Sequence, residues 1–597
     1  MSDLQHDQHR DGEVANARCG DGTSAPHTDS DNATCGSTDV LPIVAARVAA
    51  AADSTPHGRL PSWFPAAAVT LLALMVVLAC AWVATDVFDR TAHVEDEVAF
   101  LFQARVFASG ELLAEAPRNA NSFWVPFVLA HDGDWFGKYP PGWPALLGVG
   151  DALGAHWLVN PLAAGLVMVL VWLIGRRMYG PASSTGLIAA ALLATSPFLL
   201  LQGGSVMSHM TSQVVALLAL LGFLRVVADA EGDARHLRRG VALAALGCGV
   251  ALGMLLLERS LTAVGIGLPL AIWALARLVR QRGRNRTEWL RWGLVLLGFL
   301  PGAVLLLVWN HLTTGSLTTS AYELWWPYDR IGFGVGISRD GEYTLAEGID
   351  NMQANLRQLS HWLYGWPLRL SLLPALLAAG VALCAPLRRR RAPQPQAVPT
   401  GEAWRWDLLL LGTVASVVLV HLLYWTDGQM YGPRYYFETS AALALLSARG
   451  LQHLSRGIQW LVTRPTVAPR PPRVRAAAQS VPFVLGAVVL LLCVQAAQGF
   501  TSDRFDQFRG WYDMNRDGVR AVERANLDHA LVFVPLPIWT AYAPFFLEFA
   551  PDLNASVLYV ADRGAVENRE VLREFPGRSV YRYDMDNEQV LPWPGAN

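Results

Sequence analysis

The feature that most restricts the fold of this chain is a series of apolar runs, each of about 18 to 22 residues. As a helix, a run of that length spans a hydrocarbon core of roughly 30 Å. Charged residues make up 16% of the 597 residues, whereas a soluble globular chain carries about 25%. The fold class that we predict is therefore a polytopic α-helical membrane protein. The formal net charge of −2 gives no indication of a nucleic-acid partner.

Eleven transmembrane helices account for the distribution of the basic residues. We place them at residues 64–85, 157–175, 183–201, 211–229, 241–258, 260–278, 290–309, 367–387, 405–425, 436–454 and 481–499. With this count, every strongly basic connection falls on one side of the membrane, which the positive-inside rule assigns to the cytoplasm. We therefore expect a cytoplasmic N-terminus. The segments expected outside are 86–156, 202–210, 310–366, 426–435 and the C-terminal region.

Composition divides the chain into three expected domains. Residues 1–62 are polar and poor in aromatic residues, so we expect a disordered cytoplasmic tail, because they bury too little surface to offset chain entropy. Residues 63–500 form the transmembrane domain, and residues 501–597 form a small α/β domain outside the membrane. In that last domain the patterns predict strands and one helix. The strands are expected at 531–535, 556–560 and 579–583, and the helix at 567–574.

An acidic pair opens the first outer segment. Asp96 and Glu97 begin a helical pattern with apolar residues on one face, which predicts a helix lying at the membrane interface. One interpretation is that both carboxylates only stabilise the N-terminus of this helix. The other is a general base or a metal-holding pair just above the bilayer. A carboxylate partly removed from water can have its pKa raised toward the working pH.

Further along this segment, a sequence pattern typical of a β-hairpin precedes Lys138. Asp132-Gly133, between alternating apolar residues, predicts a tight turn. The turn delivers Lys138 to the start of a second interfacial helix, opened by Pro140-Pro141. Lys138 is a candidate for binding a phosphate as a point charge. The alternative is a lysine that only extends its charged end to the interface.

Other polar residues fall on the same expected side of the membrane. His209 is the titratable group of a short outer turn, and Glu258 and Arg259 end the fifth span. His209 is either a hydrogen-bonding residue or a ligand of substrate or metal. Glu258 and Arg259 either pair only with each other or form a functional acid–base pair at the membrane boundary, with Glu258 as a candidate contact of substrate or metal. Tyr322 and Trp325 belong to an aromatic-rich stretch that predicts a sugar-stacking wall or an interfacial belt.

Arg434 returns the chain toward the membrane in the segment after the ninth span. It shares one helical face with Glu438, four residues later. An Arg434–Glu438 ion pair is one interpretation. A guanidinium that binds a lipid phosphate with two hydrogen bonds is the other.

Five strings together resemble the GT-C class of membrane glycosyltransferases. They are DEVAFLFQARVFASGELL, GKYPPGWPALLGVG, SVMSHM, LLERSLTAVGIGLP and YGPRYYFE. The resemblance covers about residues 64–500 and points to the bacterial branch. This branch includes the aminoarabinose transferase of lipid A, rhizobial lipopolysaccharide-core transferases and protein O-mannosyltransferases. It implies an integral protein of the bacterial plasma (inner) membrane whose active site and C-terminus lie outside.

The resemblance also implies a reaction and roles for residues. The donor is a sugar on a polyprenyl phosphate, and the acceptor is a glycan, lipid or protein on the outer side. Asp96 would be the base on the acceptor hydroxyl, and Glu97 would orient it or help to hold a metal. Lys138 would contact the carrier phosphate, and Arg259 or Arg434 would neutralise the same leaving group.

The same resemblance leaves the metal open. An acidic residue precedes the lysine in the aminoarabinose transferase pattern, but Gly137 stands there in this chain. A divalent metal thus remains the one cofactor to consider, with His209 and Asp96 or Glu97 as a weaker set of ligands.

Two other functions compete with a glycosyltransferase. A transporter or flippase for a lipid-linked sugar would place ionisable residues near the middle of the bilayer and often shows internal repeats. We find no repeat, and the middles of the spans are nearly free of charge. A non-catalytic scaffold of the cell envelope, surrounded by membrane lipids, would have no need of Asp96.

Overall fold

The computed structural model describes residues 63–230, 237–280, 286–391, 403–464, 471–548 and 551–593. The chain divides into two units, Met1–Pro61 and Ser62–Asn597, and the second unit contains every described residue. The expected disordered tail, residues 1–62, lies outside the described residues.

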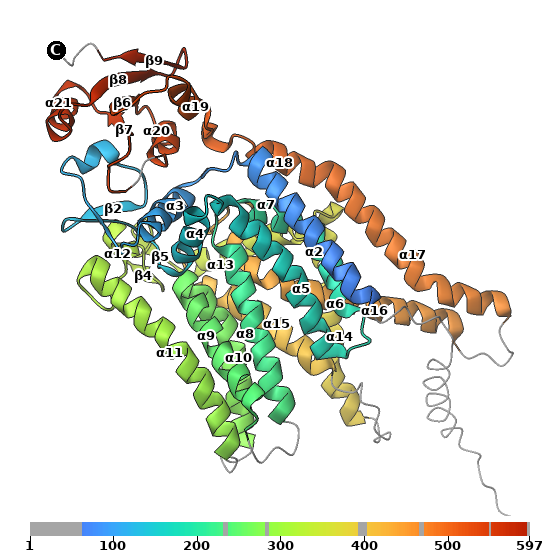
Figure 1. The fold of residues 1–597 in the computed structure, drawn as a ribbon. Coiled ribbons are helices and arrows are strands. Elements are labelled where there is room, and N and C mark those ends of the chain that lie inside the picture. Colours follow the sequence, from blue (N-terminus) through green and yellow to red (C-terminus); the bar gives the residue numbers. More distant parts are fainter. Residues whose placement is uncertain are drawn as a thin grey trace, which may run out of the picture. The chain divides into compact units, whose positions relative to one another are not determined.

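Helices that are long and apolar enough to cross a membrane form the bundle of the described chain (Figure 1). Nine pass this test within the described ranges. They are built on α2 (Phe64–Trp82), α5 (Val159–Tyr179), α8 (His209–Ala230), α9 (Arg239–Glu258), α10 (Ser260–Arg280), α11 (Arg286–Thr314), α14 (Leu373–Arg391), α15 (Ala403–His421) and α17 (Pro472–Ala496). The predicted polytopic helical membrane fold is confirmed.

The two remaining expected spans have particular features. Helices α6 (Thr185–Ala194) and α7 (Pro197–Gly204) are bent by 65° and together form a tenth candidate span. The bend follows from Pro197, which ends α6, and from Ser196, whose side chain caps α7. The expected span 436–454 corresponds to α16 (Ser440–Thr463), which is not among the helices that pass the test.

Glycines allow a close helix contact between α9 and α11. Gly249 and Gly253 lie one turn apart on α9 and face Gly298 and Gly302 on α11. A Cβ added at Gly249 would lie 1.9 Å from the carbonyl oxygen of Val295. Small residues at this spacing let two helix backbones approach each other inside a membrane.

The first outer segment folds at one end of the bundle (Figure 1). It contains α3 (Glu95–Ala108), α4 (Gly142–Ala152) and a sheet of strand order β1-β3-β2, formed by Ala114–Glu115, Asp134–Gly137 and Val128–His131. The predicted turn at Asp132-Gly133 joins β2 to β3, and both residues have positive φ. Helix α3 is buried around most of its circumference, whereas its sequence pattern predicts a single buried face.

The second long outer segment, expected at 310–366, is also folded. It contains α12 (Ala321–Trp325), the short strands β4 (Gly334–Val335) and β5 (Glu342–Tyr343), and α13 (Leu345–Trp362). Thr344 and Glu347 form a reciprocal capping box at the start of α13.

The C-terminal unit is a small α/β structure that contacts α3. Its sheet has the order β7-β6-β8-β9, formed by Val557–Asp562, Ala530–Pro535, Ser579–Asp584 and Gln589–Pro592. Its helices are α18 (Ser502–Phe508), α19 (Asp517–Arg524), α20 (Trp539–Phe546) and α21 (Ala565–Glu574). Phe546 stacks on Phe102 of α3 and meets Trp135 edge to face. The three expected strands and the expected helix are present, and β9 is an addition.

Candidate active site

A cavity of about 720 Å³ lies where the outer segments meet the end of the bundle at which α8 begins and α9 ends. We call it the outer cavity, after the side of the membrane on which we expect these segments from the sequence. Its lining combines ionisable side chains with an aromatic wall. The ionisable residues are Glu95, Asp96, Lys138, Glu258, Arg259, Glu323, Asp329, Arg330, Asp427 and Arg434, with His421. Ionisable groups that converge in one concave pocket are a usual mark of a binding or active site.

Asp96 enters the outer cavity from the first turn of α3. Its Oδ1 accepts a hydrogen bond from the Tyr139 hydroxyl at 2.7 Å and lies 3.3 Å from Nη1 of Arg434. Burial raises the pKa of Asp96, but Arg434, Lys138 and the Tyr139 hydrogen bond outweigh it and hold the pKa below its ordinary value. The expectation of a raised pKa is wrong for this residue. Asp96 is an ionised carboxylate, fixed on one side and 17% exposed.

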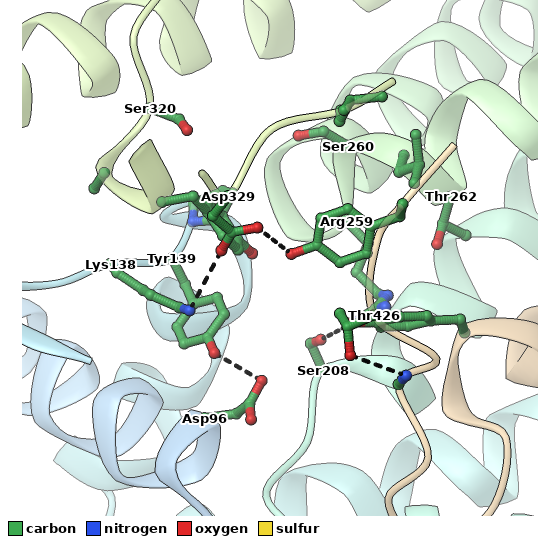
Figure 2. Close-up of a pocket in the computed structure, with 18 of the residues that line it drawn as sticks. Asp96, Lys138, Tyr139, Ser208, Arg259, Ser260, Thr262, Ser320, Asp329 and Thr426 are labelled. Atoms are coloured by element: carbon green, nitrogen blue, oxygen red, sulfur yellow. Dashed lines mark hydrogen bonds and ion pairs between the residues drawn. The ribbon is translucent and has the colours of Figure 1, made fainter. Parts of the chain in front are cut away.

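Lys138 follows β3 and reaches the cavity between aromatic side chains, with its ammonium directed at Asp329 (Figure 2). Its Nζ lies 3.5 Å from the centre of the Phe127 ring and 4.7 Å from that of Trp326. It is 3.8 Å from Oδ2 of Asp329. Burial lowers the pKa of Lys138 to about 8, although the Asp329 and Asp96 carboxylates oppose the shift. The ammonium is therefore charged at neutral pH, with a pKa that lies only slightly above that pH.

The two arginines take different partners from those the spacing suggests. Arg434 pairs with Asp96, while Glu438 pairs with Arg259, whose Nε lies 3.4 Å from Oε1 of Glu438. Arg259 also donates from Nη1 to the Ser208 hydroxyl at 3.3 Å. The expected alternative of an Arg434–Glu438 pair is thus replaced by two cross-segment pairs, which aim both guanidinium groups at the cavity wall.

Glu258 and His209 form hydrogen bonds with other residues at this end of the bundle. Glu258 accepts hydrogen bonds from the hydroxyls of Thr211 and Ser212 at 3.0 and 2.8 Å, and it lines the cavity floor. His209 is fully buried, and its Nδ1 lies 3.1 Å from Oε1 of Glu438. His209 does not line the cavity, so its position matches the hydrogen-bonding interpretation.

Glu97 points away from the outer cavity. Its Oε2 accepts from the backbone N–H of His93 at 2.8 Å, and its Oε1 accepts from that of Val206 at 2.9 Å. The Tyr431 hydroxyl donates to Oε2 at 3.2 Å. Burial raises the pKa of Glu97 to about 7, against these hydrogen bonds. Glu97 joins three segments behind the cavity and is placed to hold α3 in position.

Of the two aromatic candidates, one lines the cavity and the other does not. Tyr322 lines the cavity and meets Tyr139 edge to face. Trp325 stacks on Trp124 outside the lining, and its neighbour Trp326 takes the place in the cavity wall.

Sequence reasoning missed Tyr139 and Asp329. Asp329 is 5% exposed, and its Oδ1 accepts from the Tyr424 hydroxyl at 2.8 Å and from Nε1 of Trp425 at 2.9 Å. It therefore fixes Lys138 from the side opposite Asp96 (Figure 2). Their positions in the sequence could have indicated both residues. Asp329 directly follows the aromatic-rich stretch 322–328, and Tyr139 directly follows Lys138.

The described residues do not fit the metal that the resemblance leaves open. No group of three or more His, Cys, Asp or Glu side chains within the described ranges is arranged to hold a metal ion. A Cβ at Gly137 would lie 2.9 Å from the carbonyl oxygen of Ala99, and the Gly137 N–H donates to Gln103. An acidic side chain at this position therefore has no room without a shift of backbone.

The C-terminal unit contributes no side chain to the cavity lining among its described residues. Its contact is with the opposite side of α3, through Phe546. The loop that contains α12 does line the cavity, with Ser320, Tyr322, Trp326 and Asp329.

Comparisons with known proteins follow from this geometry. A family model described as a domain of unknown function, DUF7846, matches residues 530–593. No curated protein matches this chain. Among solved structures, similar chains are ArnT from Cupriavidus metallidurans and the archaeal oligosaccharyltransferase AglB from Archaeoglobus fulgidus. Both are GT-C glycosyltransferases, the class that the sequence motifs resemble.

The likeness to these structures extends over most of the chain at low identity. ArnT bound to undecaprenyl phosphate is 16% identical, with 86% of this chain and 89% of that chain covered and a TM-score of 0.47. Its apo form is 14% identical, with 87% and 93% covered and a TM-score of 0.49. AglB in complex with an inhibitory peptide and a dolichol-phosphate is 13% identical, with 87% and 69% covered and a TM-score of 0.45. At these values the likeness assigns no role to an individual residue.

Proposed function

We propose that this protein is a membrane glycosyltransferase that moves a sugar from a polyprenyl-phosphate-linked donor to a hydroxyl of a lipid, polysaccharide or protein acceptor. The observation that carries the proposal is the outer cavity, where an ionised carboxylate, Asp96, meets the cations Lys138, Arg259 and Arg434. A base and an anion-binding set in one cavity at a membrane end suit a reaction with a lipid phosphate as leaving group.

In this reaction Asp96 is the general base. Its carboxylate takes the proton of the acceptor hydroxyl as the hydroxyl oxygen forms a bond to the anomeric carbon of the sugar. The bond from that carbon to the carrier phosphate breaks, and the phosphate leaves with the electron pair. Tyr139, which donates to Oδ1, leaves Oδ2 of Asp96 as the oxygen to receive the proton.

The cations stabilise the phosphate on which negative charge develops. Lys138 is held in place by Asp329, and Arg259 by Glu438, so neither has to be reoriented during the reaction. Fixed charges of this kind lower the barrier because their organisation does not occur at the moment of bond breaking. Tyr322 and Trp326 provide an aromatic wall for the sugar.

The other candidate residues take supporting roles in this proposal. Glu97 is a positioning residue that fixes α3, and therefore Asp96, to the backbone around Val206. Glu258 and His209 hold the ends of α8 and α9 together around Ser208 and Glu438. We route no step through a metal, because the described residues form no group of three or more ligating side chains and Gly137 leaves no room for an acidic one.

The proposal includes a location and a division of the chain. The protein is integral to a membrane, which we propose is the bacterial plasma (inner) membrane, with the N-terminus in the cytoplasm. The outer cavity and the C-terminus then lie outside. We propose residues 63–500 as the catalytic domain and residues 501–597 as the external α/β domain, with residues 1–62 as the cytoplasmic tail.

The test is the substitution Asp96→Asn in the full-length protein. It keeps the size of the side chain but removes the basic oxygen, so we expect transfer to fall by about 10²- to 10⁴-fold. The donor for the assay is the lipid-linked sugar that accumulates in cells lacking the protein. Transfer is measured in a single turnover after reconstitution into lipid nanodiscs.

The matched control is Glu111→Gln, an exposed carboxylate just after α3, which we expect to transfer sugar at the wild-type rate. Undiminished transfer by the Asp96→Asn protein would refute the catalytic role. If no lipid-linked sugar accumulated in the deletion strain, the glycosyltransferase proposal itself would be wrong.

A further inference from the structure

A second hollow lies in the membrane bundle at the end opposite the outer cavity. It is a groove of about 690 Å³ over α8, between α5 and α9. Ser208, next to the start of α8, lines the cavity, whereas Arg225, near the end of α8, lines the groove. These two residues are separated by seventeen helical steps, about 25 Å along the helix axis. The groove is therefore a separate site.

The lining of the groove is apolar apart from one cationic end. The apolar residues are Leu173, Val215, Leu218, Leu221, Gly222, Ala244, Gly247, Cys248, Val250, Ala251 and Met254. Leu218 and Val250 are exposed, so the groove opens toward the surrounding lipid. A Cβ at Gly247 would meet no atom within 4 Å, which places this glycine at open space.

The length of the groove corresponds to one lipid leaflet. Its lining on α8 runs from Val215 to Arg225 and on α9 from Ala244 to Met254, which is about 15 Å of helix in each case. Half of a hydrocarbon core of roughly 30 Å is also about 15 Å. The groove is therefore long enough to hold an acyl chain of one leaflet from the membrane surface to the bilayer centre.

Two arginines, Arg177 and Arg225, form the cationic end. Arg177 lies two residues before the end of the span His156–Tyr179, and Arg225 three residues before the end of His209–Ala228. Both side chains are exposed. Neither has an ion-pair partner in the described part of the chain, unlike Arg259 and Arg434. A charge so close to the apolar core is retained at a membrane surface when an anion pairs with it.

We propose that this groove binds an anionic phospholipid, with one acyl chain along α8 and the headgroup phosphate between Arg177 and Arg225. The site is independent of the outer cavity and of the reaction proposed there. Basic pockets between transmembrane helices bind anionic headgroups because two guanidinium groups replace the counterions of the phosphate. The apolar groove supplies the contact with the chain, and the arginines supply the preference for negative charge.

The test is native mass spectrometry of the full-length protein with two lipids of identical chains, dioleoylphosphatidylglycerol and dioleoylphosphatidylcholine. We expect the wild type to retain the anionic lipid in preference to the zwitterionic one. Each arginine contributes about fivefold in affinity, so the double variant Arg177→Gln/Arg225→Gln should bind phosphatidylglycerol about thirtyfold more weakly. Arg177→Lys/Arg225→Lys should keep most of the preference, because the charges remain.

Two further variants separate the groove from general surface charge. Gly247→Leu fills open space without a backbone clash, and it should weaken binding of both lipids. Arg176→Gln is the matched control, because Arg176 stacks on Trp172 and does not line the groove; its lipid binding should equal that of the wild type.

Three results would overturn the proposal. They are equal retention of the two lipids by the wild type, unchanged phosphatidylglycerol binding in the double glutamine variant, and loss of a dimer instead of a lipid in Gly247→Leu. The last result would identify the occupant of the groove as a second copy of the chain. Melting temperatures equal to that of the wild type would show that each variant is folded.

Discussion

The outer cavity and the groove lie at opposite ends of α8 and α9. Both contain arginines, but only the arginines of the cavity have ion-pair partners in the described ranges. In the cavity, Arg434 is paired with Asp96 and Arg259 with Glu438. In the groove, Arg177 and Arg225 have no ion-pair partner in the described ranges. A paired charge is held in one geometry before any ligand arrives, whereas an unpaired one on a long side chain moves to meet a ligand. The first arrangement suits a reaction, and the second suits retention of a lipid.

The largest effect expected from this contrast follows the removal of a paired arginine. In Arg434→Ala the Asp96 carboxylate loses its strongest counter-charge, which leaves burial to raise its pKa. We expect transfer at pH 7 to fall by about 10²-fold or more, since one fixed donor to a developing oxyanion contributes about that much. The acid limb of the pH–rate profile should also move to higher pH, because the raised pKa leaves Asp96 protonated at pH values where it was ionised.

Arg357→Ala provides the comparison for Arg434→Ala. Arg357 is exposed on α13 and does not line the cavity, so both the rate and its pH profile should remain as in the wild type. If Arg434→Ala lowered the rate without any shift of the profile, the pairing with Asp96 would not control the base. If Arg177→Gln/Arg225→Gln lowered transfer as much as Arg434→Ala, the two ends would not be independent.

The next prediction concerns the stability of the protein. It compares substitutions of two glycines on different faces of α9. Gly249 faces α11 with no room for a side chain, whereas Gly247 faces open space. Gly249→Val should therefore destabilise the protein by about 1–3 kcal/mol through overpacking, and Gly247→Val should be close to neutral. Thermal unfolding in detergent, followed by intrinsic fluorescence, measures both. Equal melting temperatures for the two variants would contradict the close packing of α9 on α11.

The sequence predicts much of the fold, because its strongest signals are local. The apolar run that becomes α9 has the length of a span, and Asp132-Gly133 has the backbone freedom that the β2–β3 turn requires. The strand at Ala530–Pro535 is likewise a continuous apolar run. Burial of α3 around its circumference was not predictable, because it depends on tertiary packing against α4, β3 and Phe546, the last more than 400 residues away along the chain.

The candidate site is predictable as a set of residues but not as a set of contacts. Arg434 pairs with Asp96 instead of Glu438, and Lys138 with Asp329; each of these pairs joins segments far apart in the sequence. Consecutive residues on a helix point about 100° apart, which sends Asp96 into the cavity and Glu97 behind it. Which of the two faces the cavity depends on how α3 packs, and the sequence pattern alone does not contain that information.

The smallest predicted effect tests Lys138. Burial lowers its pKa to about 8, so the ammonium that would bind the phosphate is present below this pH and is lost as the pH rises through it. The affinity for a polyprenyl phosphate should therefore fall by about tenfold between pH 7 and pH 9. In Lys138→Arg the charge persists, and the affinity should be flat over that range. Glu97, with its pKa near 7, also titrates there, but it would do so in both proteins. A pH dependence that survives in Lys138→Arg would therefore assign the titration to Glu97 and remove Lys138 from the phosphate site.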